Sequence, residues 1–89
     1  MRAVISVVGK NDTGILADVS GACANVSADV LEVTQTILQD MFTMFMLVEV
    51  SEGKSDLKSL QDELEALSKK RNLVIHAMHE DIFNAMHEI

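Results

Sequence analysis

The stretch RAVISVVGKNDTGIL spans residues 2–16 and joins two patterns that decide the fold. Residues 2–8 are rich in β-branched side chains and are apolar at both alternating sets of positions, which is typical of a buried strand. Residues 9–14 form a polar turn that contains several helix-capping residue types. Apolar side chains then recur at helical spacing and predict a helix from about 13 to 27. Gly21 and its small neighbours indicate that this helix packs closely against a sheet.

The rest of the chain continues the alternation of strands and helices. Two runs rich in β-branched and apolar residues are separated only by Gln39 and Asp40, which predicts an antiparallel hairpin. Residues 51–55 then break the pattern. The remaining segments are strands at 29–38 and 41–50, an amphipathic helix that carries Leu57, Leu60, Leu64 and Leu67 and ends at Asn72, a strand at 73–78 and a short helix at 80–89.

This order, β-α-β-β-α-β with an added C-terminal helix, predicts an α+β fold of the ferredoxin-like type. Such a fold has a four-stranded antiparallel sheet with two helices on one face. The elements use the whole chain, so residues 1–89 are expected to form a single domain. The strand at 41–50 is apolar on both alternating sets of positions, so both faces of the sheet are expected to be buried. The cover for the second face would come from the C-terminal segment, a second copy of the chain, or both.

Length and composition favour the second copy. A chain of 89 residues buries only about two-thirds of its unfolded surface. Yet 48% of its residues are hydrophobic, and oligomerisation is a usual way for a small domain to cover such surface. The sequence therefore predicts a homodimer.

Charge and cysteine content exclude several classes of function. The chain has 7 Lys plus Arg against 14 Asp plus Glu, a net charge of -7, which disfavours nucleic-acid binding. Charged residues interrupt every long apolar run, so no segment is expected to span a membrane. A lone Cys23 cannot form an internal disulfide, and the apolar run at the start is too short for a signal peptide. A cytoplasmic location is expected.

Few residues are suited to catalysis. Cys23 lies on the apolar stripe of the first helix, where a thiol packs as a small hydrophobic group. His76 and His79 are followed by acidic residues and are metal-ligand types, but their odd separation on a strand points them to opposite faces. The favoured interpretation for these two and His87 is structural. The sequence predicts no metal site, no cofactor and no enzyme activity.

The turn at 9–14 is the strongest candidate for a binding site. A strand-to-helix turn directs free backbone N–H groups and a partial positive charge outward, which suits a carboxylate. Asn11 adds a donor and an acceptor, and Gly14 allows close approach to the backbone. Asp29, at the start of the second strand, would face an ammonium group. A site with the helix N-terminus at one end and this carboxylate at the other matches an α-amino acid. Capping and turn roles are the alternative for Asn11, Asp12 and Asp29.

The sequence also resembles a known family. Residues 8–16, VGKNDTGIL, resemble the first loop of an ACT domain. That loop commonly has an Asp, then a Gly two residues later, and then two aliphatic residues. The segments at 35–44 and 79–89 resemble stand-alone single-domain ACT proteins of bacteria and archaea, an uncharacterised protein family. The resemblance covers essentially the whole chain.

The resemblance implies a domain that pairs with a second copy, binds a small ligand near the first loop and regulates another protein. Carried onto this chain, it implies ligand contacts from Asn11, Asp12, Thr13, Gly14, Ile15, Leu16 and Asp29. The family commonly has Asn where this chain has Asp29, so the ammonium acceptor is kept and an amide donor is lost.

Together these observations predict a non-catalytic regulatory module that senses an amino acid or similar metabolite and signals to a partner enzyme or regulator. A protein-interaction module with no small ligand is the alternative, and an enzyme is a third and weaker one.

Overall fold

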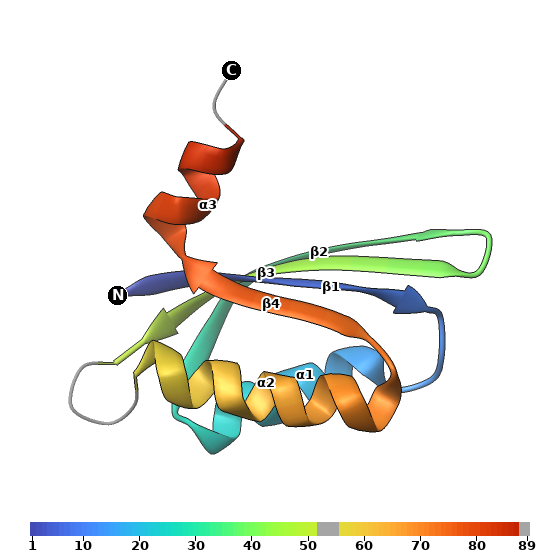
Figure 1. Cartoon of the computed structure of the whole chain (residues 1–89), viewed down its shortest axis with the longest axis horizontal. Helices are drawn as coiled ribbons and strands as arrows, with labels where there is room; N and C mark the ends of the chain where they lie inside the picture. The colour runs from blue at the N-terminus through green and yellow to red at the C-terminus, as the bar shows by residue number, and fades with distance from the viewer. Residues whose placement is uncertain (52–55, 88–89) are drawn as a thin grey trace.

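The computed structural model describes residues 1–51 and 56–87, and its helices and strands follow the predicted order (Figure 1). The predicted break at 51–55 falls largely on residues outside these ranges, as do the last two residues of the predicted C-terminal helix. The elements are β1 (Arg2–Lys10), α1 (Ile15–Asn25), β2 (Ala28–Leu38), β3 (Met41–Val50), α2 (Leu57–Arg71), β4 (Val74–His79) and α3 (Glu80–Met86).

The four strands form one antiparallel sheet in the order β2-β3-β1-β4. β1 lies in the middle and pairs with β3 from Arg2–Glu49 to Lys10–Met41 and with β4 from Ala3–His79 to Val8–Val74. Helices α1 and α2 lie side by side against one face of the sheet (Figure 1). The predicted ferredoxin-like α+β fold is therefore confirmed.

The core lies between this face and the two helices. Along β3 every second residue is buried, because successive strand side chains point to opposite faces. Leu60 and Leu64 of α2 are 0% and 2% exposed and close the core from the helix side. The largest fully buried side chains are Ile5, Met44, Met46, Leu60, Leu64, Val7, Val19, Val48, Val50 and Cys23.

Helix α1 begins differently from the prediction. The sequence placed its start near residue 13 with a polar side chain as the cap. The helix begins at Ile15 instead, and its N-cap is Gly14, which has no side chain to form a capping hydrogen bond. The Asp12 carboxylate instead accepts a hydrogen bond of 2.8 Å from the N–H of Thr13. The polar residues of the loop therefore shape the turn and do not cap the helix.

Helix α2 has side-chain and backbone signals at both ends. The Asp56 carboxylate accepts a hydrogen bond of 2.8 Å from the N–H of Ser59, and this bond lowers the pKa of Asp56 below its ordinary value. Asn72 ends the helix, as predicted, in a left-handed conformation with φ 56°. None of the helices in the described ranges is long and apolar enough to span a bilayer.

One chain covers the second face of the sheet only in part, and the expected cover by a second copy stays a prediction. Helix α3 lies on the side of the sheet opposite α1 and α2 (Figure 1), and the rings of Phe83 and Phe45 meet edge to face at 5.9 Å. The predicted C-terminal segment therefore supplies some of the cover. Phe45 nevertheless stays 40% exposed, and every residue of β2 except Ala28 is exposed.

Gly21 is a second correction. The sequence indicated that this glycine allows α1 to approach the sheet closely, but a Cβ atom added there would meet no atom within 4 Å. The close approach occurs at Gly9 instead, where an added Cβ would lie 2.5 Å from Leu73 Cδ2. Gly9 therefore lets the segment after α2 pack directly on β1.

Two methionines of β3 test where the core lies. We expect Met44→Ala to lower the free energy of unfolding by about 2–5 kcal/mol, because Met44 is fully buried and its truncation leaves a cavity. Met41→Ala on the same strand removes a side chain that is 49% exposed and should cost about 0.5 kcal/mol or less. Urea denaturation followed by circular dichroism measures both. Equal losses would contradict this placement of the core.

Candidate functional site

The loop between β1 and α1 is held by backbone contacts to a neighbouring turn. The N–H of Asn11 donates a hydrogen bond of 2.6 Å to the carbonyl of Asp40, in the turn between β2 and β3. Two segments almost thirty residues apart in sequence therefore meet at one end of the sheet. The loop is thereby fixed as it leaves the central strand.

Arg71, the last residue of α2, anchors the same loop from the helix side. Its Nε donates to Asp18 Oδ2 at 2.6 Å, and its Nη2 donates to the carbonyl of Thr13 at 2.6 Å. Nη1 lies 3.5 Å from Asp12 Oδ2. The Arg71 side chain is only 19% exposed, whereas Asp18 is 43% and Asp12 is 76% exposed, so a well-held cation meets carboxylates at the surface.

Gly14 makes room for this guanidinium. Its φ is 84°, in the left-handed region that residues with a Cβ rarely adopt. A Cβ atom at this position would also lie 3.1 Å from Arg71 Nη2. Gly14 therefore serves both the turn and the approach of Arg71, whereas the sequence suggested that it leaves the backbone open to a ligand.

A cavity of about 340 Å³ opens beside the loop and Arg71. Small-molecule sites in proteins commonly fall in the range of about 300–1,000 Å³, so this space suits a small metabolite. Charges of both signs, amides and two aliphatic side chains surround it. The lining residues are Lys10, Asn11, Asp12, Ile15, Arg71, Asn72 and Leu73.

The predicted ligand contacts do not all gather at this cavity. Asn11, Asp12 and Ile15 line it. Thr13 and Gly14 do not line it, and both lie against the Arg71 guanidinium. Leu16, which is 37% exposed, is not among the lining residues.

Asp29 lies at the opposite end of the sheet. It pairs with Glu49, which in turn pairs with Arg2, whereas the loop follows Lys10. Arg2 and Lys10 are eight residue steps apart along the strand, a distance of about 26 Å at about 3.3 Å per step. One chain therefore does not bring Asp29 to the loop, and the ligand contact of this carboxylate stays a prediction.

Sequence reasoning missed Arg71, Lys10, Asn72 and Leu73. Arg71 ends a run of three basic residues at the C-terminus of α2, where cations commonly interact with the helix dipole and solvent. Its partners lie 53 and 58 residues earlier in the chain. Lys10 and Asn72 carried a weaker signal, since Lys10 lies inside the candidate turn at 9–14 and Asn72 ends the predicted second helix.

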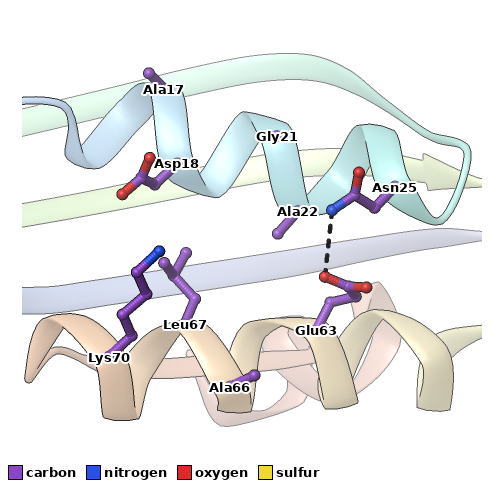
Figure 2. A pocket seen from close by; sticks show the side chains of 9 residues that line it. All are labelled: Ala17, Asp18, Gly21, Ala22, Asn25, Glu63, Ala66, Leu67 and Lys70. Carbon is purple, nitrogen blue, oxygen red and sulfur yellow. Dashed lines mark hydrogen bonds between the residues drawn. The ribbon is translucent and has the colours of Figure 1, made fainter.

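A second hollow lies between α1 and α2, with a volume of about 360 Å³ (Figure 2). Figure 2 shows Asn25 and Glu63 facing each other across it, and Asn25 Nδ2 donates to Glu63 Oε2 at 3.5 Å. Small residues, including Gly21, line the hollow and leave its space unfilled. No residue predicted to contact a ligand lines this groove.

The histidines have separate surroundings. His76 pairs with Ser6 and His79 with Ala3, so their side chains point to opposite faces of the sheet. His79 Nδ1 accepts a hydrogen bond of 3.0 Å from the N–H of Asp81 and caps α3. Among the described residues, no three His, Cys, Asp or Glu side chains converge as metal ligands.

Comparison with known proteins adds the following similarities. A family model described as ACT domain matches residues 2–78. A UPF0237 protein of Clostridium perfringens is 44% identical over 89 residues and covers 100% of both chains. A UPF0237 protein of Methanocaldococcus jannaschii is 41% identical over 88 residues, covering 99% of this chain and 98% of the other.

Solved structures agree with these matches. An ACT domain protein from Streptococcus pneumoniae has a TM-score of 0.77 and 36% identity, covering 100% of this chain and 96% of that chain. The regulatory subunit of aspartate kinase from Thermus thermophilus has a TM-score of 0.68 and 19% identity, covering 86% and 50%. The second similarity shows the fold alone.

Two glycines of the α1 region provide a matched test of the loop geometry. Gly14→Ala should destabilise the protein by about 1–2 kcal/mol, because φ is positive and the added methyl meets Arg71. Gly21→Ala should stabilise it by about 0.5–1 kcal/mol, because the position is helical and open. Thermal and urea denaturation measure both changes. A neutral Gly14→Ala substitution would contradict the described turn.

Cys23 is expected to be inert in the folded protein. It is fully buried, and burial raises the pKa of its thiol to about 11, so the reactive thiolate is scarce at pH 8. A disulfide reagent at pH 8 should label it slowly in buffer and rapidly in urea. Rapid labelling without denaturant would contradict the packing of α1.

Proposed function

The chain belongs to the ACT domain family, and on this premise we propose that it is a non-catalytic regulatory module that senses an amino acid or similar small metabolite as a homodimer. Its bound state is read by a partner protein, an enzyme or a regulator. ACT domains are in general regulatory, ligand-binding modules. A lone buried cysteine suits the reducing cytoplasm, where we expect the protein to act.

The cavity at the β1–α1 loop is the observation that carries this proposal. Lys10 and Arg71 present positive charge to one small space, and Asp12 presents negative charge to the same space. A ligand with both a carboxylate and an ammonium group meets opposite charges there. Ile15 and Leu73 add apolar surface for a side chain, and Asn11 adds an amide that both donates and accepts.

The homodimer is supported by surface that one chain leaves uncovered. β2 is an edge strand of the sheet, and its hairpin with β3 reaches beyond the ends of α1 and α2 (Figure 1). Exposed edge strands that carry apolar side chains are natural sites for pairing with another chain. Val33 is 40% and Ile37 is 54% exposed on this strand. A second copy is also the means by which Asp29 would approach the loop of its partner.

Signalling requires the ligand to distinguish between two arrangements of the dimer. A ligand that binds both arrangements equally shifts nothing, however tightly it binds. The loop is a suitable place for such a difference, because it touches the β2–β3 turn through Asn11 and the end of α2 through Arg71. Movement at the loop would therefore reach both the hairpin and the helix layer.

A thermal-shift panel of the common amino acids tests the proposal. A ligand with sub-millimolar affinity should raise the melting temperature at millimolar concentration by mass action. Asn11→Ala should weaken the response, because it removes the amide from the cavity. Asn25→Ala is the matched control, since Asn25 lies in the α1–α2 groove and should leave the response unchanged. No shift with any amino acid would count against this function.

A protein-interaction module without a small ligand is the second candidate, and exposed apolar surface on the sheet side favours it. Leu38 is 73% exposed, and Met86 of α3 is 65% exposed. In that case, a variant with Asn11→Ala and Asp29→Ala would keep its fold, its dimer and its partner binding. Analytical ultracentrifugation, with and without the purified partner, distinguishes the two candidates.

A further inference from the structure

We propose that Arg71 binds a carboxylate group of the ligand, and that this carboxylate takes the place of Asp12 beside the guanidinium. The inference rests on the proposed function, because it specifies how the cavity at the β1–α1 loop holds its ligand. The ligand class is a small organic carboxylate.

The hydrogen bonds of Arg71 leave one side of the guanidinium available. Nε is engaged by Asp18 and Nη2 by the carbonyl of Thr13, both at 2.6 Å. Nη1 lies 3.5 Å from Asp12 Oδ2, which is longer than an ordinary N–H···O hydrogen bond. Nη1 donates no hydrogen bond to the part of the chain that the structure describes, and Arg71 lines the cavity.

The two members of this long contact differ in how firmly they are held. Arg71 is 19% exposed and is fixed by its two short bonds, whereas Asp12 is 76% exposed. The turn still holds Asp12 through Oδ1, which accepts the 2.8 Å hydrogen bond from the Thr13 N–H, and only Oδ2 makes the long contact with Arg71. Exposed ion pairs contribute little to stability, so giving up the Oδ2 contact while Oδ1 keeps its bond is inexpensive. A ligand carboxylate can accept hydrogen bonds through both of its oxygens. It would replace the long contact between Nη1 and Asp12 with a close, charge-assisted pair.

Lys10 strengthens the preference for an anion. It lines the same cavity and forms no ion pair with any residue in the described ranges, whereas Arg2 pairs with Glu80 and Lys58 with Asp62. When the Asp12 Oδ2 contact is given up, Lys10 and Arg71 still line the cavity, and Asp18 remains bound to Nε. Asp18 offsets the charge of Arg71, so Lys10 supplies the additional positive charge that favours an anion.

A carboxylate, and not a phosphate, is the assigned class because a carboxylate group already occupies the position. The planar guanidinium edge fits two carboxylate oxygens, and the cavity of about 340 Å³ accommodates a molecule of metabolite size. Ile15 and Leu73 would contact the carbon skeleton of that molecule.

The test is a nuclear magnetic resonance titration that observes the Nε–H signals of arginine. The chain contains two arginines, Arg2 and Arg71, so Arg2 serves as an internal control. The probes are acetate, succinate and glutamate, with acetamide and succinamide as neutral analogues and inorganic phosphate as a second anion. The carboxylates should shift the Arg71 signal saturably, while the neutral amides leave it in place.

Three variants sharpen the result. Asp12→Asn should tighten the binding of acetate and succinate, which carry no ammonium group, by about two- to fivefold, because it removes the competing anion. Asp62→Asn removes a carboxylate that is 61% exposed and does not line the cavity, and it should change nothing. Arg71→Lys should weaken binding at least about tenfold, because ammonium cannot make the same two-pronged contact. Circular dichroism checks that each variant is folded.

The outcomes separate this inference from the proposed function. A saturable Arg71 response to plain carboxylates, with no response specific to amino acids, would support the inference and remove the amino-acid ligand. Amino-acid binding with an unmoved Arg71 signal, or an unchanged affinity in Asp12→Asn, would overturn the inference and leave the proposed function standing. A response to phosphate alone would overturn the assignment to carboxylates.

Discussion

The guanidinium of Arg71 joins the last turn of α2 to the loop that connects β1 and α1. Its two bonds of 2.6 Å, to Asp18 and to the carbonyl of Thr13, fix the loop where the central strand of the sheet ends. Gly14 is required by this contact as much as by its own positive φ. The cavity exists because the loop, the helix end and the segment that returns to the sheet are held around it. A change in that contact would therefore alter the candidate site directly.

Much of the fold was predictable because its signals are local. The alternation of buried residues in β3, the leucines of α2 and the left-handed Asn72 all follow from short patterns in the chain. The cover of the second sheet face was not predictable in the same way. Apolar residues such as Phe45 indicate that a face is suited to burial, but not which element buries it. Likewise, small residues around Gly21 did not reveal which side of α1 faces the sheet.

The candidate site was only partly predictable. Asn11 and Asp12 line the cavity, and both lie in the strand-to-helix turn that the sequence singled out as the candidate binding site. Arg71 was missed because a contact across more than fifty residues leaves no pattern in a basic helix end. The position of Asp29 was open to reasoning: β1 and β2 both pair antiparallel with β3, so both run in the same direction. The start of β2 therefore lies far from the loop that ends β1.

A regulatory role for this chain depends on ligand binding at that loop, next to the exposed hairpin and the helix layer. The most direct measurement is a map of backbone amide chemical shifts on addition of the twenty common amino acids, first as a mixture and then singly. The account predicts the largest shifts at residues 10–18 and 71–73, with smaller changes along the β2–β3 hairpin. Shifts confined to the α1–α2 groove, or no shifts at millimolar ligand, would contradict it.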